Sequence, residues 1–173
     1  MSRYLLVDIG AGTMDILYYD SRSKLPYKAV VKSPVRTVAE KASALSGNLV
    51  VTGNEMGGGP ITDALREKAR KFKVVMSASS AATLHHNPEV VNSWGIRIVD
   101  DAEAEKKMLD NDYTPLTIGD LEPERLESIV AGFGVPFSFD VVGICAQDHG
   151  VPPAGVSHLD YRHNLFRAVL DRS

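Results

Sequence analysis

Two runs of strand-forming residues near the start of the chain are joined by the segment Asp8-Ile9-Gly10-Ala11-Gly12-Thr13-Met14-Asp15. Residues 4–9 are almost uniformly apolar, as in a strand covered on both faces, and residues 14–19 resume a β-prone pattern. Gly10 and Gly12 break the pattern, and glycine accepts the positive φ of tight turns. The segment therefore predicts a β-hairpin.

The turn of this hairpin has the residue types of a phosphate-binding loop. Two glycines expose the main chain so that backbone N–H groups can converge on an anion, and Thr13 adds a hydroxyl donor. Asp8 is placed to hold Mg²⁺ through water, because hard cations at phosphate sites use one or two carboxylates and keep most of their hydration. The alternative is a plain hairpin whose aspartates cap exposed amides. The acidic residues on both sides of the turn, Asp8 and Asp15, favour the phosphate site.

The rest of the chain alternates between strand and helix patterns. Strands are expected at 28–32, 49–52, 74–76, 96–99 and 141–146, and helices at 35–45, 60–72, 102–109, 123–131 and 161–170. Residues 77–80 are expected to form a loop. This alternation indicates an α/β fold with a largely parallel sheet that opens with an antiparallel hairpin. The length of 173 residues fits a single domain over residues 1–173.

Composition excludes several classes of protein. A net charge of −3 without a large basic cluster argues against nucleic acid as a partner. The chain has neither a signal-peptide pattern nor an apolar run long enough for a membrane span, so we expect a cytoplasmic protein without a membrane partner. Cys145 is the only cysteine, which excludes a cluster ligated by three or four thiolates of this chain.

The hairpin resembles the phosphate motif of the superfamily that includes actin, the Hsp70 chaperones, sugar kinases and bacterial cell-division ATPases. The pattern Asp-apolar-Gly-Gly-Gly-Thr-x-Asp is followed from Asp8 to Asp15, with a departure at Ala11. The resemblance implies a ribonuclease-H-like lobe, a mixed sheet with helices on both faces. It also implies Mg²⁺ near Asp8 and a second lobe in the same or another chain. The ATP phosphates would be bound by Gly10, Ala11, Gly12, Thr13 and Asp15.

A second resemblance involves residues 142–150, which are similar to the sugar-kinase strand that runs Ile-Gly-x-Ser-Gly-Gln-x-His-Gly into the cleft. It implies that Gln147, Asp148 and His149 lie in the cleft and that Asp148 orients a water or an acceptor hydroxyl. The alternative is a strand-to-loop turn in which Asp148 is a cap and His149 bonds to the backbone.

The glycine run Gly57-Gly58-Gly59 precedes an expected helix, and a helix N-terminus can face an anion. It is not a P-loop, because no Gly-Lys-Ser/Thr follows, and a simple strand-to-helix connection is the alternative. Asn54 and Glu55, just before it, are candidate polar cleft residues.

More of the chain resembles a prokaryotic family that carries the label of pyruvate formate-lyase activating enzyme. That label implies radical chemistry with a cysteine-ligated cluster, which Cys145 alone cannot supply. We therefore expect a different activity, namely Mg·ATP binding with hydrolysis or phosphoryl transfer if a second lobe closes the cleft. The alternatives are a small-molecule kinase of sugar-kinase type and a non-catalytic assembly protein that retains the fold. The sequence does not fix the oligomeric state, and a homo-oligomer is one of the alternatives.

Overall fold

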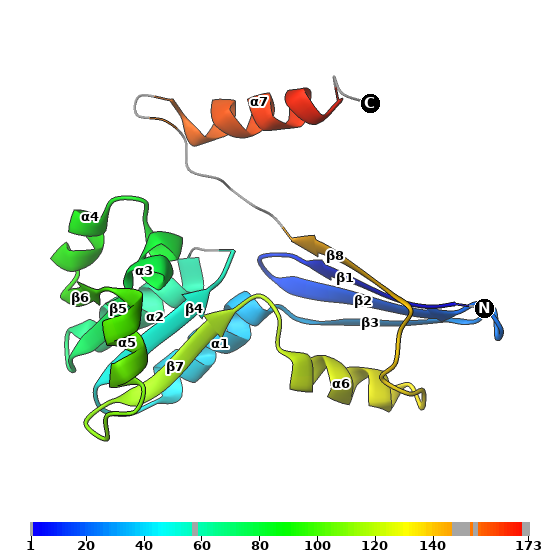
Figure 1. The fold of residues 1–173 in the computed structure, drawn as a ribbon, viewed down its shortest axis with the longest axis horizontal. Helices are drawn as coiled ribbons and strands as arrows, with labels where there is room; N and C mark the ends of the chain where they lie inside the picture. The colour runs from blue at the N-terminus through cyan, green and yellow to red at the C-terminus, as the bar shows by residue number, and fades with distance from the viewer. Residues whose placement is uncertain (1, 57–58, 147–152, 154–155, 171–173) are drawn as a thin grey trace.

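The computed structural model describes residues 2–56, 59–146, 153 and 156–170. Two four-stranded sheets, sheet A and sheet B, lie side by side (Figure 1). The chain begins in sheet A, leaves it to build sheet B with its helices, and then returns to sheet A (Figure 1). The architecture is therefore α/β, with one mixed and one parallel sheet.

Sheet A contains the predicted hairpin. Its strands are β1 (Arg3–Ile9), β2 (Thr13–Asp20), β3 (Pro26–Lys32) and β8 (Val141–Ala146). Their order is β3-β2-β1-β8, in which β1 is antiparallel to β2 and parallel to β8. Side chains alternate between the two faces of a strand, and the buried face of β1 and β2 packs against helix α6 (Pro123–Gly132) through Leu126 and Val130.

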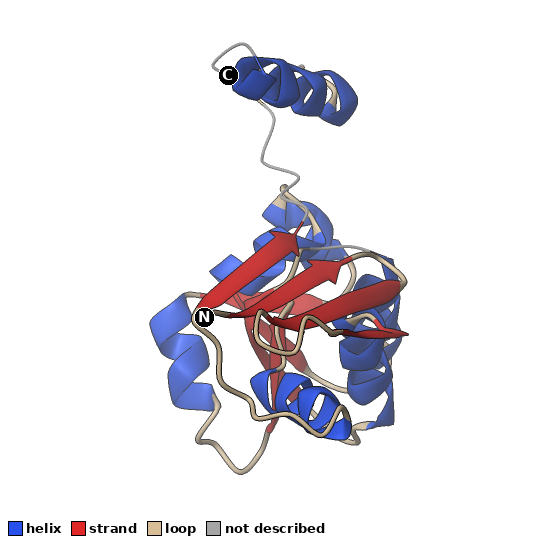
Figure 2. Ribbon diagram, turned by 90° about the vertical axis from the view of Figure 1, so that its right-hand side faces the viewer, coloured by secondary structure: helices blue, strands red, loops and turns tan. Residues whose placement is uncertain are grey.

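The opposite face of sheet A, called the open face here, carries exposed side chains. Leu6 of β1 is 43% exposed and Val30 of β3 is 65% exposed. The prediction that the first strand is covered on both faces is therefore wrong, because the described helices cover only one side of sheet A. Helix α7 (His158–Leu170) stands apart from both sheets (Figures 1 and 2).

Sheet B is entirely parallel. Its strands, in the order β6-β5-β4-β7, are β4 (Leu49–Asn54), β5 (Val74–Ser77), β6 (Ile96–Val99) and β7 (Thr114–Gly119). The side chains of Leu49, Val50 and Val51 are completely buried, which is what a central strand covered on both faces requires. Burial of each such side chain contributes roughly 1.5–3 kcal/mol.

Helices cover both faces of sheet B. The larger core is formed with α1 (Pro34–Ala44), α2 (Gly59–Ala69), α3 (Ala78–Leu84) and α4 (Pro88–Ser93). On the other face α5 (Asp101–Lys107) contributes Ala104, which packs with Val75 and Val99. In the described chain, no helix is long and apolar enough to cross a membrane.

Three sequence expectations need correction. The strands form two sheets rather than one, because the chain leaves sheet A after β3 and starts a new parallel sheet at β4. Strand β7 was not expected. Residues 77–80 are not a loop: Ser77 ends β5 and its hydroxyl caps α3 by accepting a hydrogen bond from the Ser80 N–H.

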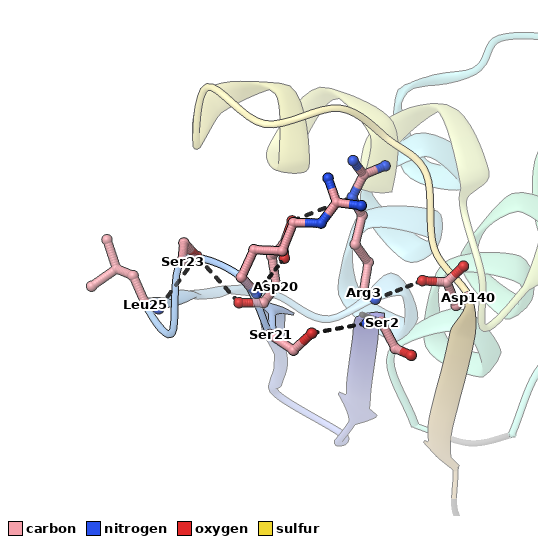
Figure 3. Close-up of polar contacts among 8 residues, drawn as sticks. Ser2, Arg3, Asp20, Ser21, Ser23, Leu25 and Asp140 are labelled. Atoms are coloured by element: carbon pink, nitrogen blue, oxygen red, sulfur yellow. Dashed lines mark hydrogen bonds and ion pairs between the residues drawn. The ribbon is translucent and has the colours of Figure 1, made fainter.

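The end of sheet A far from the β1–β2 turn is held by side-chain contacts (Figure 3). The backbone N–H of Arg3 donates to Asp140 Oδ2 at 2.8 Å and its Nε to Asp20 Oδ2 at 3.4 Å, which joins β1 to β8 and β2 (Figure 3). The Arg22 N–H, followed by the Arg3 side chain, lowers the pKa of Asp20. These contacts join β1 to both of its neighbours at one end of sheet A, and the β1–β2 turn lies at the opposite end.

Candidate functional site

The β1–β2 turn is only partly closed by its own hydrogen bonds. The Gly10 N–H donates to Thr13 O at 2.9 Å, and the Ser33 N–H donates to Gly12 O at 3.1 Å. Within the described part of the chain, the N–H groups of Ala11 and Gly12 donate to no acceptor. Two adjacent amides of the turn are therefore available to an anion.

The glycines of this turn matter because they have no side chain, not because they adopt a positive φ. Neither Gly10 nor Gly12 has a positive φ, so that part of the sequence prediction is wrong. A Cβ on Gly10 would lie 3.2 Å from Thr13 O, a tight contact, and one on Gly12 would lie 4.0 Å from Arg36 Nε. The absence of side chains keeps the main chain accessible and lets an arginine come close.

Asp8 and Asp15 lie together on the open face. They are register partners in the antiparallel pair of β1 and β2, and both are exposed. Partners in this position have Cβ atoms about 4.5–5.5 Å apart, and like charges directly opposite each other destabilise a sheet. The Thr13 hydroxyl reaches Asp15 Oδ2 only at 3.5 Å. The pair is therefore arranged as a cation site would be, with both carboxylates accessible.

A hollow of about 530 Å³ extends over the open face beside these carboxylates. Its lining is mainly apolar, and Lys28 adds a positive charge. The complete lining is Leu6, Val7, Asp8, Asp15, Ile16, Leu17, Lys28, Ala29, Val30, Gly143, Ile144 and Cys145. The hollow gives a ligand access to Asp8 and Asp15 across the face of the sheet.

Arg36 is a candidate that sequence analysis missed. It lies in the first turn of α1, where the Arg36 N–H donates to Ser33 O at 3.0 Å, and Ser33 is itself bonded to the hairpin. Whereas the neighbouring Lys32 is paired with Glu40, Arg36 makes no ion pair within the described residues. The local sequence does not indicate a functional role for an exposed helical arginine. Arg36 lies near Gly12 only because β3 pairs with β2 and so places the start of α1 beside the turn.

A second hollow, of about 500 Å³, lies between α1 and the start of α2 and is lined by Arg36, Ala39, Glu40, Ser43, Ala44 and Pro60. Pro60, in the first turn of α2 (which begins at Gly59), and Arg36 thus line the same hollow. Four other sequence candidates lie outside the described residues, namely Gly57, Gly58, Gln147 and His149. The proposed catalytic Asp148 lies there as well.

A further acidic pair occurs at the carboxyl edge of sheet B, where Glu55 follows β4 and Asp120 follows β7. Glu55 is only 4% exposed, and neither of its carboxyl oxygens has a hydrogen-bond partner in the described part of the protein. Burial, and then the charge of Asp120, raise the pKa of Glu55 to about 7. Sequence analysis identified Glu55 as a polar residue of this loop, but its burial and its neighbour Asp120 were not predicted.

The two sheets and their helices define an α/β protein. Residues 56–173 match the family described as "Putative pyruvate format-lyase activating enzyme (DUF1786)". This match covers more than half of the chain, so the protein belongs to that family, and the expected family relationship is confirmed. The hairpin residues precede the matched region. No curated protein matches the chain.

Proposed function

We propose that the β1–β2 hairpin binds the phosphates of a magnesium nucleotide, as part of an actin-like ATPase or phosphotransferase lobe. The observation that carries this proposal is the pairing of Asp8 with Asp15 on the open face, next to the free amides of Ala11 and Gly12. Anion donors and cation ligands a few residues apart are what a metal–phosphate ligand requires.

The residues around the turn fit the two parts of such a ligand. The free amides, the Thr13 hydroxyl and the Arg36 guanidinium are donors suited to phosphate oxygens. The carboxylates of Asp8 and Asp15 suit a hydrated Mg²⁺. When bound, the metal would neutralise phosphate charge, which is its main contribution to phosphoryl transfer.

The topology of sheet A gives further support. A mixed sheet that opens with an antiparallel hairpin and continues with a parallel strand is compatible with a ribonuclease-H-like lobe. Sheet B then lies in the chain between β3 and α6 as an insertion. In this arrangement the residue before α1 is bonded to the turn, and α1 shares a hollow with the start of α2.

Isothermal titration of the protein with ATP and ADP, with and without Mg²⁺, tests the proposal. The wild-type protein should bind ATP, and Mg²⁺ should strengthen binding. Asp8→Asn should remove most of the Mg²⁺ effect, on the order of tenfold in affinity, because one of the two carboxylates that hold the hydrated metal is lost. Asp112→Asn is the matched control, since Asp112 is an exposed aspartate before β7. Failure of the wild-type protein to bind either nucleotide would refute the proposal.

Turnover is a separate question from binding. Phosphate release from Mg·ATP, measured alone and with a panel of sugars and polyols, distinguishes an ATPase from a small-molecule kinase. If Asp148 orients the attacking group, Asp148→Asn should abolish release and leave the nucleotide affinity unchanged. Binding without any turnover would instead favour a non-catalytic role for the same fold.

A further inference from the structure

The carboxyl edge of sheet B has the topology of a ligand site. From β4 the chain continues to β5 and β6 on one side, whereas β7 pairs with β4 on the other side. The connections that leave β4 and β7 therefore diverge. In open α/β sheets, ligands bind in the crevice that forms at such a switch point, outside the carboxyl ends of the strands. Glu55 and Asp120 follow these two strands directly.

Glu55 is unusual because its carboxyl group is buried without, among the described residues, the hydrogen bonds or ion pair that buried carboxyl groups normally have. Its side chain is 4% exposed, and both carboxyl oxygens lack a hydrogen-bond partner in the part of the chain that the structure describes. Buried polar groups are almost always bonded, and a buried carboxyl without a partner requires an explanation such as an ion that completes the site. The negative charge of the nearby Asp120 further disfavours an ionised Glu55, and a bound cation would offset this repulsion.

Hydrogen bonds and close packing hold the Asp120 carboxyl and the backbone next to Glu55 in place. The Met56 N–H donates to Asp120 Oδ1 at 2.8 Å, which ties the residue after Glu55 to the end of β7. Gly53 has a φ of +87°, and a Cβ there would lie 2.2 Å from Ile118 O, so β4 and β7 approach closely just before the pair. The Ser80 hydroxyl donates to Gly53 O at 2.5 Å from α3. The Asp120 carboxyl and the backbone on both sides of Glu55 are therefore held at the ends of β7 and β4.

We propose that Glu55 and Asp120 bind a divalent metal ion of the Mg²⁺ or Mn²⁺ class at the carboxyl edge of sheet B, separate from the Asp8–Asp15 pair. Hard divalent cations take carboxylate oxygens and complete their shell with water. Glu55 offers two free oxygens, Asp120 retains one that Met56 does not use, and the half-buried Asp120 gives water a route to the ion. None of the ion pairs in the described structure places a lysine or arginine on either carboxylate.

The ion would connect the two sheets of the protein. Met56, next to Glu55, packs against the core of sheet A that contains Leu5 and Ile9. Asp120 lies on the connection from β7 to α6, the helix that covers sheet A. Metal binding at the pair would therefore stabilise the junction between the sheets without any nucleotide.

The test uses Mn²⁺ and nucleotide-free protein that has been treated with a chelator. Asp8→Asn combined with Asp15→Asn removes the open-face carboxylates, so that of the two proposed carboxylate pairs only the one in sheet B is left. In this background, electron paramagnetic resonance should detect one bound Mn²⁺ per chain, and Mn²⁺ should raise the melting temperature. Because ATP is absent, the outcome is independent of the proposed nucleotide site.

Adding Glu55→Gln to this background should weaken Mn²⁺ binding at least tenfold and abolish the rise in melting temperature. Asp120→Asn should act in the same direction. Glu55→Gln removes a repelled buried charge, so the metal-free variant should fold at least as well as its parent, and loss of binding cannot be attributed to unfolding. Absence of Mn²⁺ binding in the background protein, or equal binding after Glu55→Gln, would overturn the proposal.

Discussion

The protein contains two pairs of carboxylates that differ in their contact with water. Asp8 and Asp15 face each other on the open face of sheet A, and both are exposed. Glu55 lies beside Asp120 with 4% of its surface exposed. Repulsion in the first pair is screened by solvent, whereas in the second pair Glu55 is desolvated and the repulsion by the half-buried Asp120 is screened less. The exposed pair should therefore influence ligand binding, and the buried pair should also influence stability.

The largest effect is expected from a change that breaks the frame of the buried pair. Gly53→Ala would place a Cβ 2.2 Å from Ile118 O at a φ of +87°. Strain and the backbone clash together should lower the free energy of unfolding by roughly 3 kcal/mol or more, measured by urea denaturation. Gly47→Ala is the matched control, because Gly47 has a φ of +82° with nothing within 4 Å. It should lose only about 1–2 kcal/mol. Equal losses in the two variants would contradict the close approach of β4 and β7.

The second prediction concerns pH. The pKa of Glu55 is raised from 4.5 to about 7 in the folded protein, so the native state binds the proton more tightly than the unfolded state. Stability should therefore fall as the pH rises from about 4.5 to about 7 and level off above that. Glu55→Gln cannot titrate and should be more stable than the wild-type protein above pH 7, by roughly 3 kcal/mol at most.

Urea denaturation at a series of pH values, in the presence of a chelator, measures this difference. The gap between the two proteins should open over the window between the two pKa values and should be smallest at its acidic end. Glu105→Gln, a change at an exposed glutamate of α5, should show no such gap. A constant difference between wild type and Glu55→Gln at every pH would argue against a buried, titrating Glu55.

The exposed pair should behave in the opposite way. Asp8→Asn should change the free energy of unfolding by less than about 1 kcal/mol, because it removes only a screened repulsion across the strands. The same variant should nevertheless lose the Mg²⁺ dependence of ATP binding. Denaturation and calorimetry on one preparation compare the two effects. A large loss of stability would show that Asp8 has a structural role.

The smallest change in stability is expected at Arg36. Its side chain is exposed, so Arg36→Ala should alter the free energy of unfolding by no more than about 0.5 kcal/mol. Loss of one charge-assisted contact should weaken ATP binding by about tenfold, and Arg36→Lys should restore part of it. Arg66→Ala, at a helix α2 arginine over Trp94, should leave ATP affinity unchanged. Equal ATP affinity of Arg36→Ala and wild type would remove Arg36 from the site.

Local patterns in the sequence were sufficient for the hairpin and for several elements of sheet B. The opposition of Asp8 and Asp15 follows once the turn is placed, because both residues are close to it in the same register. Strand β7 escaped detection because Pro115 and Gly119 are residue types that are depleted in strands. Proline is tolerated there because β7 is an edge strand. Helix α3 was missed because its serines are typical of loops.

Long-range features could not be predicted in this way. The position of Arg36 beside Gly12 depends on β3, and the meeting of Glu55 with Asp120 depends on the pairing of β4 with β7. The local sequence of a strand does not indicate which of the two sheets it joins. The open face of sheet A was also unexpected, since the apolar residues of β1 suit a doubly covered strand equally well.

The most direct test of the account follows the backbone amides of the hairpin by ¹⁵N NMR while Mg·ATP is added. The amide signals of Ala11 and Gly12 should shift in a saturable manner, and those of Arg3 and Arg22, at the bonded end of sheet A, should not. Saturable shifts that spare Ala11 and Gly12, or no shifts at all, would contradict the claim that the β1–β2 turn binds phosphate.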